Sequence, residues 1–186
     1  MTQTVTPIEE HRLEHRLDAA TAAATEMLTA LGVPIHEDDL ADTPRRLVHA
    51  YAELLTPDAF EMTTFPNREQ YDELVLVRDI PVPSLCEHHM LPFIGVAHVG
   101  YLPGKRIVGL SKLARTVDFH ARRVQTQERL TSQVADDLQD QLDPLGVGVV
   151  IEAEHTCMSV RGARAEGAHT VTARLLGQIR ANCKMP

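Results

Sequence analysis

The sequence has 186 residues, 44% of them hydrophobic and 24% charged, which is typical of a soluble globular protein. Its formal net charge of −8 argues against a binder of bulk nucleic acid, which usually carries the opposite sign. No stretch approaches the roughly 18 apolar residues of a membrane span, and the N-terminus lacks the apolar core of a secretory signal. Three cysteines in such a chain are typical of a reducing compartment, so we expect a cytoplasmic protein with free thiols.

Hydrophobic periodicity predicts two helices in the N-terminal part of the chain. Apolar residues recur at three- and four-residue spacing from about Ile8 to Leu31, and Gly32 follows as a stop signal. Asp42-Thr43-Pro44 then predicts the start of a second helix, which runs to about Leu55.

From about residue 71 the pattern changes to paired strands around a helical segment. The predicted elements are a strand over 73–80 ended by Pro81 and Pro83, a strand over 93–101, two helices within 111–141 broken near Arg123, and strands over 146–154 and 170–178. This ββααββ order predicts an α+β fold with an antiparallel four-stranded sheet and an N-terminal helical extension. Such a sheet has exposed edges, which oligomerisation would cover.

The segment Ser84-Leu-Cys-Glu-His-His89 carries the densest set of reactive side chains. Cys86 and His89 are close enough in sequence to bind one metal ion, and a thiolate with an imidazole suits Zn²⁺. A second cluster around Cys157 follows the third predicted strand, so it can fold back onto the first. Each cluster alone is more typical of a buried cysteine that binds no metal.

Three protein ligands, Cys86, His89 and Cys157, would leave a fourth position for water, which is the arrangement of a catalytic zinc. His88 and His155 then remain as proton carriers. The spacing does not decide which of the histidines is the ligand. Cys183 lies near the end of the chain, and we expect it to be a bystander.

Basic residues gather at two further places. Ser111, Lys112 and Arg115 begin the predicted helix after Gly109, and Arg161 follows the second cysteine cluster. Together with the helix N-terminus they could bind a phosphate chain, although each alone is typical of a solvated surface charge.

These residues fall within longer stretches that resemble the GTP cyclohydrolase I family. The matching stretches are Ser84–His89, Val108–Leu113, Gln125–Leu130 and His155–Gly162, in the same order, within a resemblance from about Leu31 to Gly177. The resemblance implies the tunnelling fold, with an N-terminal helical region over residues 1–65 and a catalytic domain over 66–186. It also implies a homodecamer of two stacked pentamers, with active sites at subunit interfaces.

The implied reaction converts GTP and water to 7,8-dihydroneopterin triphosphate and formate, the first step toward folate-type pterins. The resemblance implies Cys86, His89 and Cys157 as zinc ligands and His88 and His155 as catalytic proton carriers. The implied substrate contacts are Glu128 at the guanine edge with Gln127 beside it, and Ser111, Lys112, Arg115 and Arg161 at the triphosphate. His49 stands where the family pattern has a lysine, which weakens one phosphate contact.

Two other functions fit part of this pattern. A tunnelling-fold nitrile reductase would use Cys86 or Cys157 as a nucleophile with NADPH, and would need no metal. A non-catalytic module would enclose a structural zinc with a fourth protein ligand, His88 or His155. The zinc content and the effect of replacing His88 separate these alternatives.

Overall fold

The computed structural model describes residues 7–182, and their side chains from residue 15 onward. The chain divides into two compact units, Met1–Glu53 and Leu54–Pro186. Within the described residues, no helix is both long enough and apolar enough to cross a membrane.

The first unit contains the two expected N-terminal helices, α1 (Pro7–Ala30) and α2 (Thr43–Leu54). Only Leu54, the last residue of α2, belongs to the second unit. Gly32 adopts a left-handed φ of +79° just after α1. The backbone N–H groups of Gly32 and Val33 donate back to the carbonyls of Thr29 and Leu28. Helices commonly end at a left-handed residue, and glycine adopts this conformation most easily. Gly32 therefore ends α1, as the sequence predicts.

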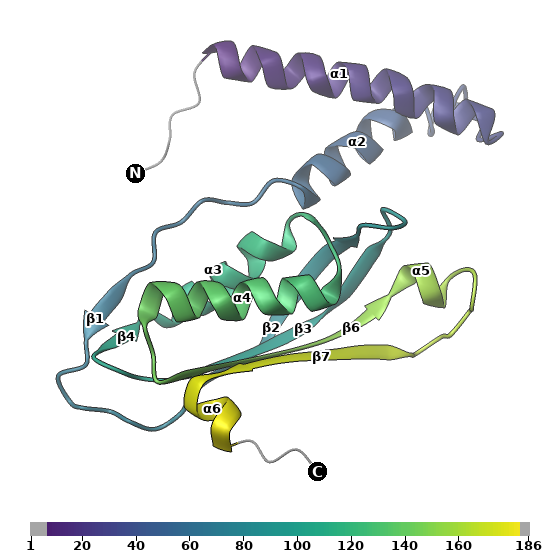
Figure 1. The fold of residues 1–186 in the computed structure, drawn as a ribbon. Coiled ribbons are helices and arrows are strands. Elements are labelled where there is room, and N and C mark those ends of the chain that lie inside the picture. The colour runs from purple at the N-terminus through teal and green to yellow at the C-terminus, as the bar shows by residue number, and fades with distance from the viewer. Residues whose placement is uncertain (1–6, 183–186) are drawn as a thin grey trace. The chain divides into compact units, whose positions relative to one another are not determined.

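The second unit is a mixed five-stranded sheet covered on one face by two helices (Figure 1). The strand order is β5-β2-β3-β6-β7, antiparallel except for the short parallel pair between β5 and β2. The bounds are β2 (Val75–Cys86), β3 (Pro92–Leu102), α3 (Leu110–Ala121), β5 (Val124–Gln125), α4 (Gln127–Leu142), β6 (Gly146–His155) and β7 (His169–Leu176). The ββααββ order predicted from the sequence is therefore confirmed.

Four short elements complete the unit. Strands β1 (Thr64–Pro66) and β4 (Arg106–Val108) pair with each other outside the main sheet. Helix α5 (Thr156–Ser159) follows β6, and helix α6 (Gly177–Asn182) follows β7. Thr64 and Phe65, which the sequence placed in the N-terminal region, therefore belong with the second unit through their pairing with Val108 and Ile107.

The hydrophobic core lies between the sheet and the two long helices. Phe93, Val99 and Ile151 point into it from the sheet and are fully buried. They meet an apolar face of α3 and α4 that includes Leu113 and Leu130. The opposite face of the sheet is open in the single chain, where Ile94 and Val171 are each 60% exposed.

The prolines of β2 correct one prediction. Pro81 and Pro83 were expected to end the strand, but β2 continues through both of them to Cys86. Both residues pair with β3, opposite Val96 and Ile94. Proline is tolerated on a strand edge that has no partner, and β5 contacts β2 only at Leu85 and Cys86. The extra length of β2 is what carries Cys86 to the end of the sheet.

Candidate active site

The cysteine clusters meet because β2 and β6 flank β3 and end at the same edge of the sheet. Cys86 is the last residue of β2. His155 is the last residue of β6 and pairs with Phe93 at the start of β3. The hydroxyl of Thr156 donates to the carbonyl of Pro92 at 2.6 Å, which fastens α5 and its Cys157 to the same edge.

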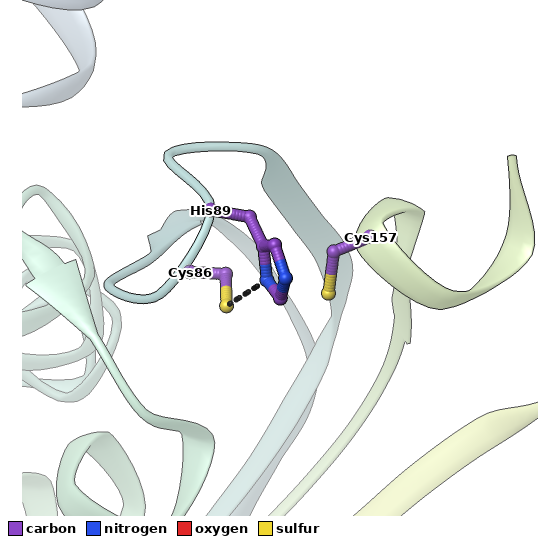
Figure 2. Close-up of side chains that lie close together, drawn as sticks. All are labelled: Cys86, His89 and Cys157. Carbon is purple, nitrogen blue, oxygen red and sulfur yellow. Dashed lines mark hydrogen bonds between the residues drawn. The ribbon is translucent and has the colours of Figure 1, made fainter. Parts of the chain in front are cut away.

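Cys86, His89 and Cys157 form a compact group of metal donors (Figure 2). Their ligand atoms all lie within 4.8 Å of one another, and Cys86 Sγ is 3.9 Å from His89 Nδ1. Ligands of one tetrahedral zinc would be about 3.6–3.8 Å apart, given Zn–S and Zn–N bonds of about 2.3 and 2.1 Å. Two thiols and an imidazole at this spacing therefore fit a zinc ion with little movement.

The turn after Cys86 gives His89 its position. The Cys86 carbonyl accepts hydrogen bonds from the backbone N–H groups of His89 at 3.4 Å and Met90 at 2.8 Å. Met90 has a left-handed φ of 55°, which lets the chain turn back into β3. The ring of His89 consequently lies beside both sulfur atoms (Figure 2).

The two cysteines affect each other electrostatically. Burial and the neighbouring Cys86 raise the pKa of the Cys157 thiol, while Arg161 opposes that rise. Two thiolates side by side repel each other, so a divalent cation between them would favour the charged forms of both.

His88 and His155 adjoin the metal group without belonging to it. The His88 side chain is 67% exposed, and its Nδ1 lies 3.9 Å from Cys86 Sγ. His155 is half-buried, and its ring stacks on Phe93 with centroids 4.6 Å apart and planes 13° apart. Burial lowers the pKa of His155, and the nearby Glu128 carboxylate opposes that shift. The ring is therefore neutral near pH 7 and able to accept a proton.

A cavity of about 260 Å³ connects these groups. Its lining includes the three metal donors, both further histidines and the exposed Glu128 at the start of α4. The remaining lining residues are Gln125, Thr126, Gln127, Met158 and Thr170. The metal donors, the proton carriers and Glu128 predicted from the sequence thus meet around one space.

Gln127 is buried, whereas its neighbour Glu128 is exposed. The Gln127 side chain is 1% exposed, and its amide nitrogen lies within hydrogen-bonding distance of Ile151 O, Thr170 O and Thr172 Oγ1. Its Oε1 lies 2.8 Å from His155 Nε2. The amide therefore has no free hydrogen to offer a substrate.

The basic cluster of α3 does not join the cavity within one chain. The carbonyl of Ala121, at the end of α3, accepts a hydrogen bond from Ser84 Oγ at 2.7 Å, close to Cys86. Ser111, Lys112 and Arg115 lie in the first half of this 12-residue helix, which is about 18 Å long. Arg161, in contrast, follows α5 and lies near enough to Cys157 to influence its pKa.

The sequence reasoning missed Arg129, which joins α4 to the metal-binding turn. Its guanidinium pairs with Glu87 and donates to Gln125 Oε1 at 2.8 Å and Val124 O at 3.2 Å. Gln125 is 1% exposed, and its backbone carbonyl accepts from the Glu87 N–H at 3.0 Å. No spacing rule identifies such a residue, because its partners lie in two other segments, the turn after β2 and strand β5. Cys183 lies outside the described residues.

Comparison with known proteins shows similarity to one family over most of the chain. The family model described as GTP cyclohydrolase I matches residues 20–185. The proteins named GTP cyclohydrolase 1 from Mycolicibacterium gilvum and Mycobacteroides abscessus are 53% and 51% identical over 166 and 179 residues. These matches cover 87% and 91% of this chain and 82% and 87% of the relatives. The Corynebacterium glutamicum protein of the same name is 49% identical over 170 residues, covering 89% of this chain and 87% of its own.

Among solved structures, the archaeosine synthase QueF-Like in the apo form has a TM-score of 0.47 and 16% identity. It covers 56% of this chain and 93% of its own. A likeness of this degree carries no conclusion about activity.

Proposed function

Because the chain belongs to the GTP cyclohydrolase I family and is an enzyme of that activity, we propose that it uses zinc to convert GTP and water to 7,8-dihydroneopterin triphosphate and formate. This reaction would be the first step toward folate-type pterins. The observation that carries the proposal is the group of Cys86, His89 and Cys157 on a cavity that also contains two further histidines.

The donor set supports a catalytic rather than a structural metal. Among the described residues, the metal-binding group contains three donors, which leaves one tetrahedral position for water. A zinc ion held by these three residues would lower the pKa of water toward about 7, which would supply a nucleophile for C8 of guanine. His88 and His155 stand outside the group, although both line the cavity.

The two histidines supply the proton transfers that ring opening requires. Breaking an aromatic C–N bond needs a proton on the leaving nitrogen, and we assign that donation to His88, whose side chain is largely exposed at the cavity. We assign the later transfers, which release C8 as formate, to His155. Its burial favours the neutral ring, so it enters the reaction as a proton acceptor.

Glu128 is suited to recognition of the guanine base. Guanine presents two adjacent N–H donors on its pyrimidine edge, and a carboxylate offers two acceptor oxygens in matching geometry. Glu128 is exposed in the first turn of α4 and lines the cavity. Removal of its side chain would leave those donors unpaired.

The triphosphate contacts support a homo-oligomer, the homodecamer of two pentamers implied by the family resemblance. Arg161 lies near Cys157, but Ser111, Lys112 and Arg115 lie in the first half of α3, and none of the three lines the cavity in one chain. If all four bind one triphosphate, a neighbouring subunit must provide the α3 cluster. The open sheet face, with Ile94 and Val171 exposed, also favours assembly. In this arrangement, the catalytic domain proposed over residues 66–186 has a complete active site only in the assembly.

Incubation of the purified protein with GTP tests the proposal, with and without a zinc chelator. We expect formate and a pterin that fluoresces after oxidation, both abolished by the chelator and restored by zinc. A protein that consumes NADPH with a nitrile substrate and forms no formate from GTP would instead be the nitrile reductase, and would overturn the proposal.

A further inference from the structure

The side chain of Gln127 is a buried polar group that the proposed chemistry does not use. Gln127 is the first residue of α4, and it is 1% exposed. Its amide nitrogen lies 3.0 Å from Ile151 O on β6 and 2.9 Å from Thr170 O on β7. The amide is therefore anchored to two strands of the sheet as well as to its own helix.

These contacts fix which end of the amide faces His155. The carbonyl oxygens of Ile151 and Thr170 can only accept hydrogen bonds, so the group facing them must be the NH₂ end. The amide oxygen of Gln127 then faces His155 Nε2, at 2.8 Å. Because an amide oxygen can only accept, Nε2 of the histidine must carry the hydrogen.

A hydroxyl pair supports the same orientation. Thr131 Oγ1 donates to the backbone carbonyl of Gln127 at 2.7 Å, and it lies 2.6 Å from Thr172 Oγ1. With the Thr131 hydrogen used in this way, Thr172 donates to Thr131 and accepts from the Gln127 amide nitrogen at 3.2 Å. The two hydrogens of the Gln127 NH₂ group serve three acceptors, so the longer contact to Thr172 shares a hydrogen with one of the two shorter contacts.

The plane of the His155 ring is fixed by a separate contact. Phe93 stacks against it at 4.6 Å, and the two residues are paired on neighbouring strands. With the ring plane set by Phe93 and Nε2 held by Gln127, rotation of the ring is restrained. Among the described residues, no protein group is hydrogen-bonded to Nδ1 of His155.

We propose that Gln127 is a positioning residue, which holds the neutral His155 ring in the tautomer with its hydrogen on Nε2 and leaves Nδ1 as the proton-accepting atom of the active site. This inference rests on the proposed function, in which His155 moves protons on the substrate. A proton that leaves the substrate is bound at Nδ1, while the other hydrogen stays on Nε2 and keeps its hydrogen bond to the Gln127 oxygen. The same proton returns from Nδ1 in a later step, so Gln127 gains and loses none.

The tautomer can be observed directly in the zinc-loaded protein. Nitrogen-15 NMR of histidine-labelled protein distinguishes a ring with hydrogen on Nε2 from one with hydrogen on Nδ1. A His155→Asn sample identifies the His155 signal among the ten histidines of the chain. We expect the Nε2–H form in the wild type, and a wild type with hydrogen on Nδ1 would overturn the proposal without any further variant.

Two variants separate positioning from substrate contact. Gln127→Met keeps the length of the side chain but removes the acceptor, so we expect a mixture of tautomers. Its kcat should fall by about tenfold to a hundredfold, which is less than the roughly 10²–10⁴-fold contribution of a general acid–base group, because His155 itself remains. The KM for GTP should change by less than about twofold. Gln127→Glu keeps an oxygen opposite Nε2 but places a second acceptor against the carbonyls of Ile151 and Thr170. It should therefore keep the Nε2–H form while lowering the unfolding midpoint.

Thr131→Val is the matched control, because it breaks the same buried network without touching His155. It should lower the unfolding midpoint while the tautomer and kcat stay as in the wild type. A Gln127→Met protein with wild-type kcat and a raised KM would show that Gln127 is a substrate contact and would overturn the proposal. If the wild type forms no formate from GTP, the proposed function fails, yet the NMR result still decides the tautomer.

Discussion

Arg129, in the first turn of α4, forms an ion pair with Glu87, which lies between the metal donor Cys86 and His88. The same guanidinium bonds to Gln125 and to the carbonyl of Val124. A single side chain therefore ties the metal-binding turn to both β5 and α4. Groups that hold metal ligands in place from outside typically change metal affinity by about 10–100-fold when they are removed.

The Arg129→Ala variant should accordingly bind zinc about tenfold more weakly, measured by competition with a chromophoric chelator. The matched control is Arg174→Ala, which removes an ion pair of similar exposure, to Asp136, elsewhere in the same unit. An equal effect of both variants on zinc affinity would show that the loss is general rather than local to the metal-binding turn.

Replacement of His88 separates a catalytic zinc from a closed structural zinc. Because His88 lies outside the group of three donors, His88→Ser should keep its zinc and its oligomeric state but lose turnover. Cys157→Ala should lose zinc and turnover together, since two ligands hold the ion poorly. Metal analysis by mass spectrometry, alongside the formate assay, makes the comparison. Loss of zinc from His88→Ser would mean that His88 is a fourth ligand.

Glu128→Ala should retain zinc and raise the KM for GTP by roughly tenfold or more, because a charge-assisted hydrogen bond contributes about 1.5–3 kcal/mol. Asp140→Ala is a suitable control, since Asp140 is an exposed acidic residue farther along the same helix. Steady-state kinetics with GTP measures both. Unchanged GTP affinity in Glu128→Ala would remove this residue from the guanine site.

Because folding lowers the pKa of His155, the stability of the metal-free protein should depend on pH. A histidine whose pKa is depressed by folding stabilises the fold fully above its unfolded pKa of 6.5, and that stability is lost as the pH falls below it. Between pH 7 and pH 5, the unfolding midpoint of metal-free wild type should therefore fall further than that of metal-free His155→Gln. Thermal unfolding at the two pH values tests this, and parallel losses in the two proteins would exclude His155 as the cause.

The meeting of Cys86 and Cys157 could be predicted from the sequence because their placement depends on simple topology. Cys86 and Cys157 follow strands that flank the same central strand, so a ββααββ order brings them to one edge. The choice between His88 and His89 could not be made from spacing, because it depends on the turn at Met90. Only the family resemblance indicated His89, and the geometry of the metal group agrees with it.

Other features depend on contacts that no local pattern reveals. The position of Gln127 follows from partners 24 and 43 residues away, on two strands whose register had to be known. The sequence predicts that Pro81 and Pro83 end the strand, because it does not show that this part of β2 is an open edge. It also predicts the α3 cluster at the active site, but in one chain the cluster lies in the first half of α3 and does not line the cavity.

Titration of zinc into the metal-free protein, with formate release from GTP as the readout, tests the central claim most directly. The cluster of Cys86, His89 and Cys157 predicts that activity is absent without zinc and rises in proportion to added metal, up to one zinc ion per subunit. Full formate release by the metal-free protein would contradict the claim, as would zinc binding at that stoichiometry without any release of formate.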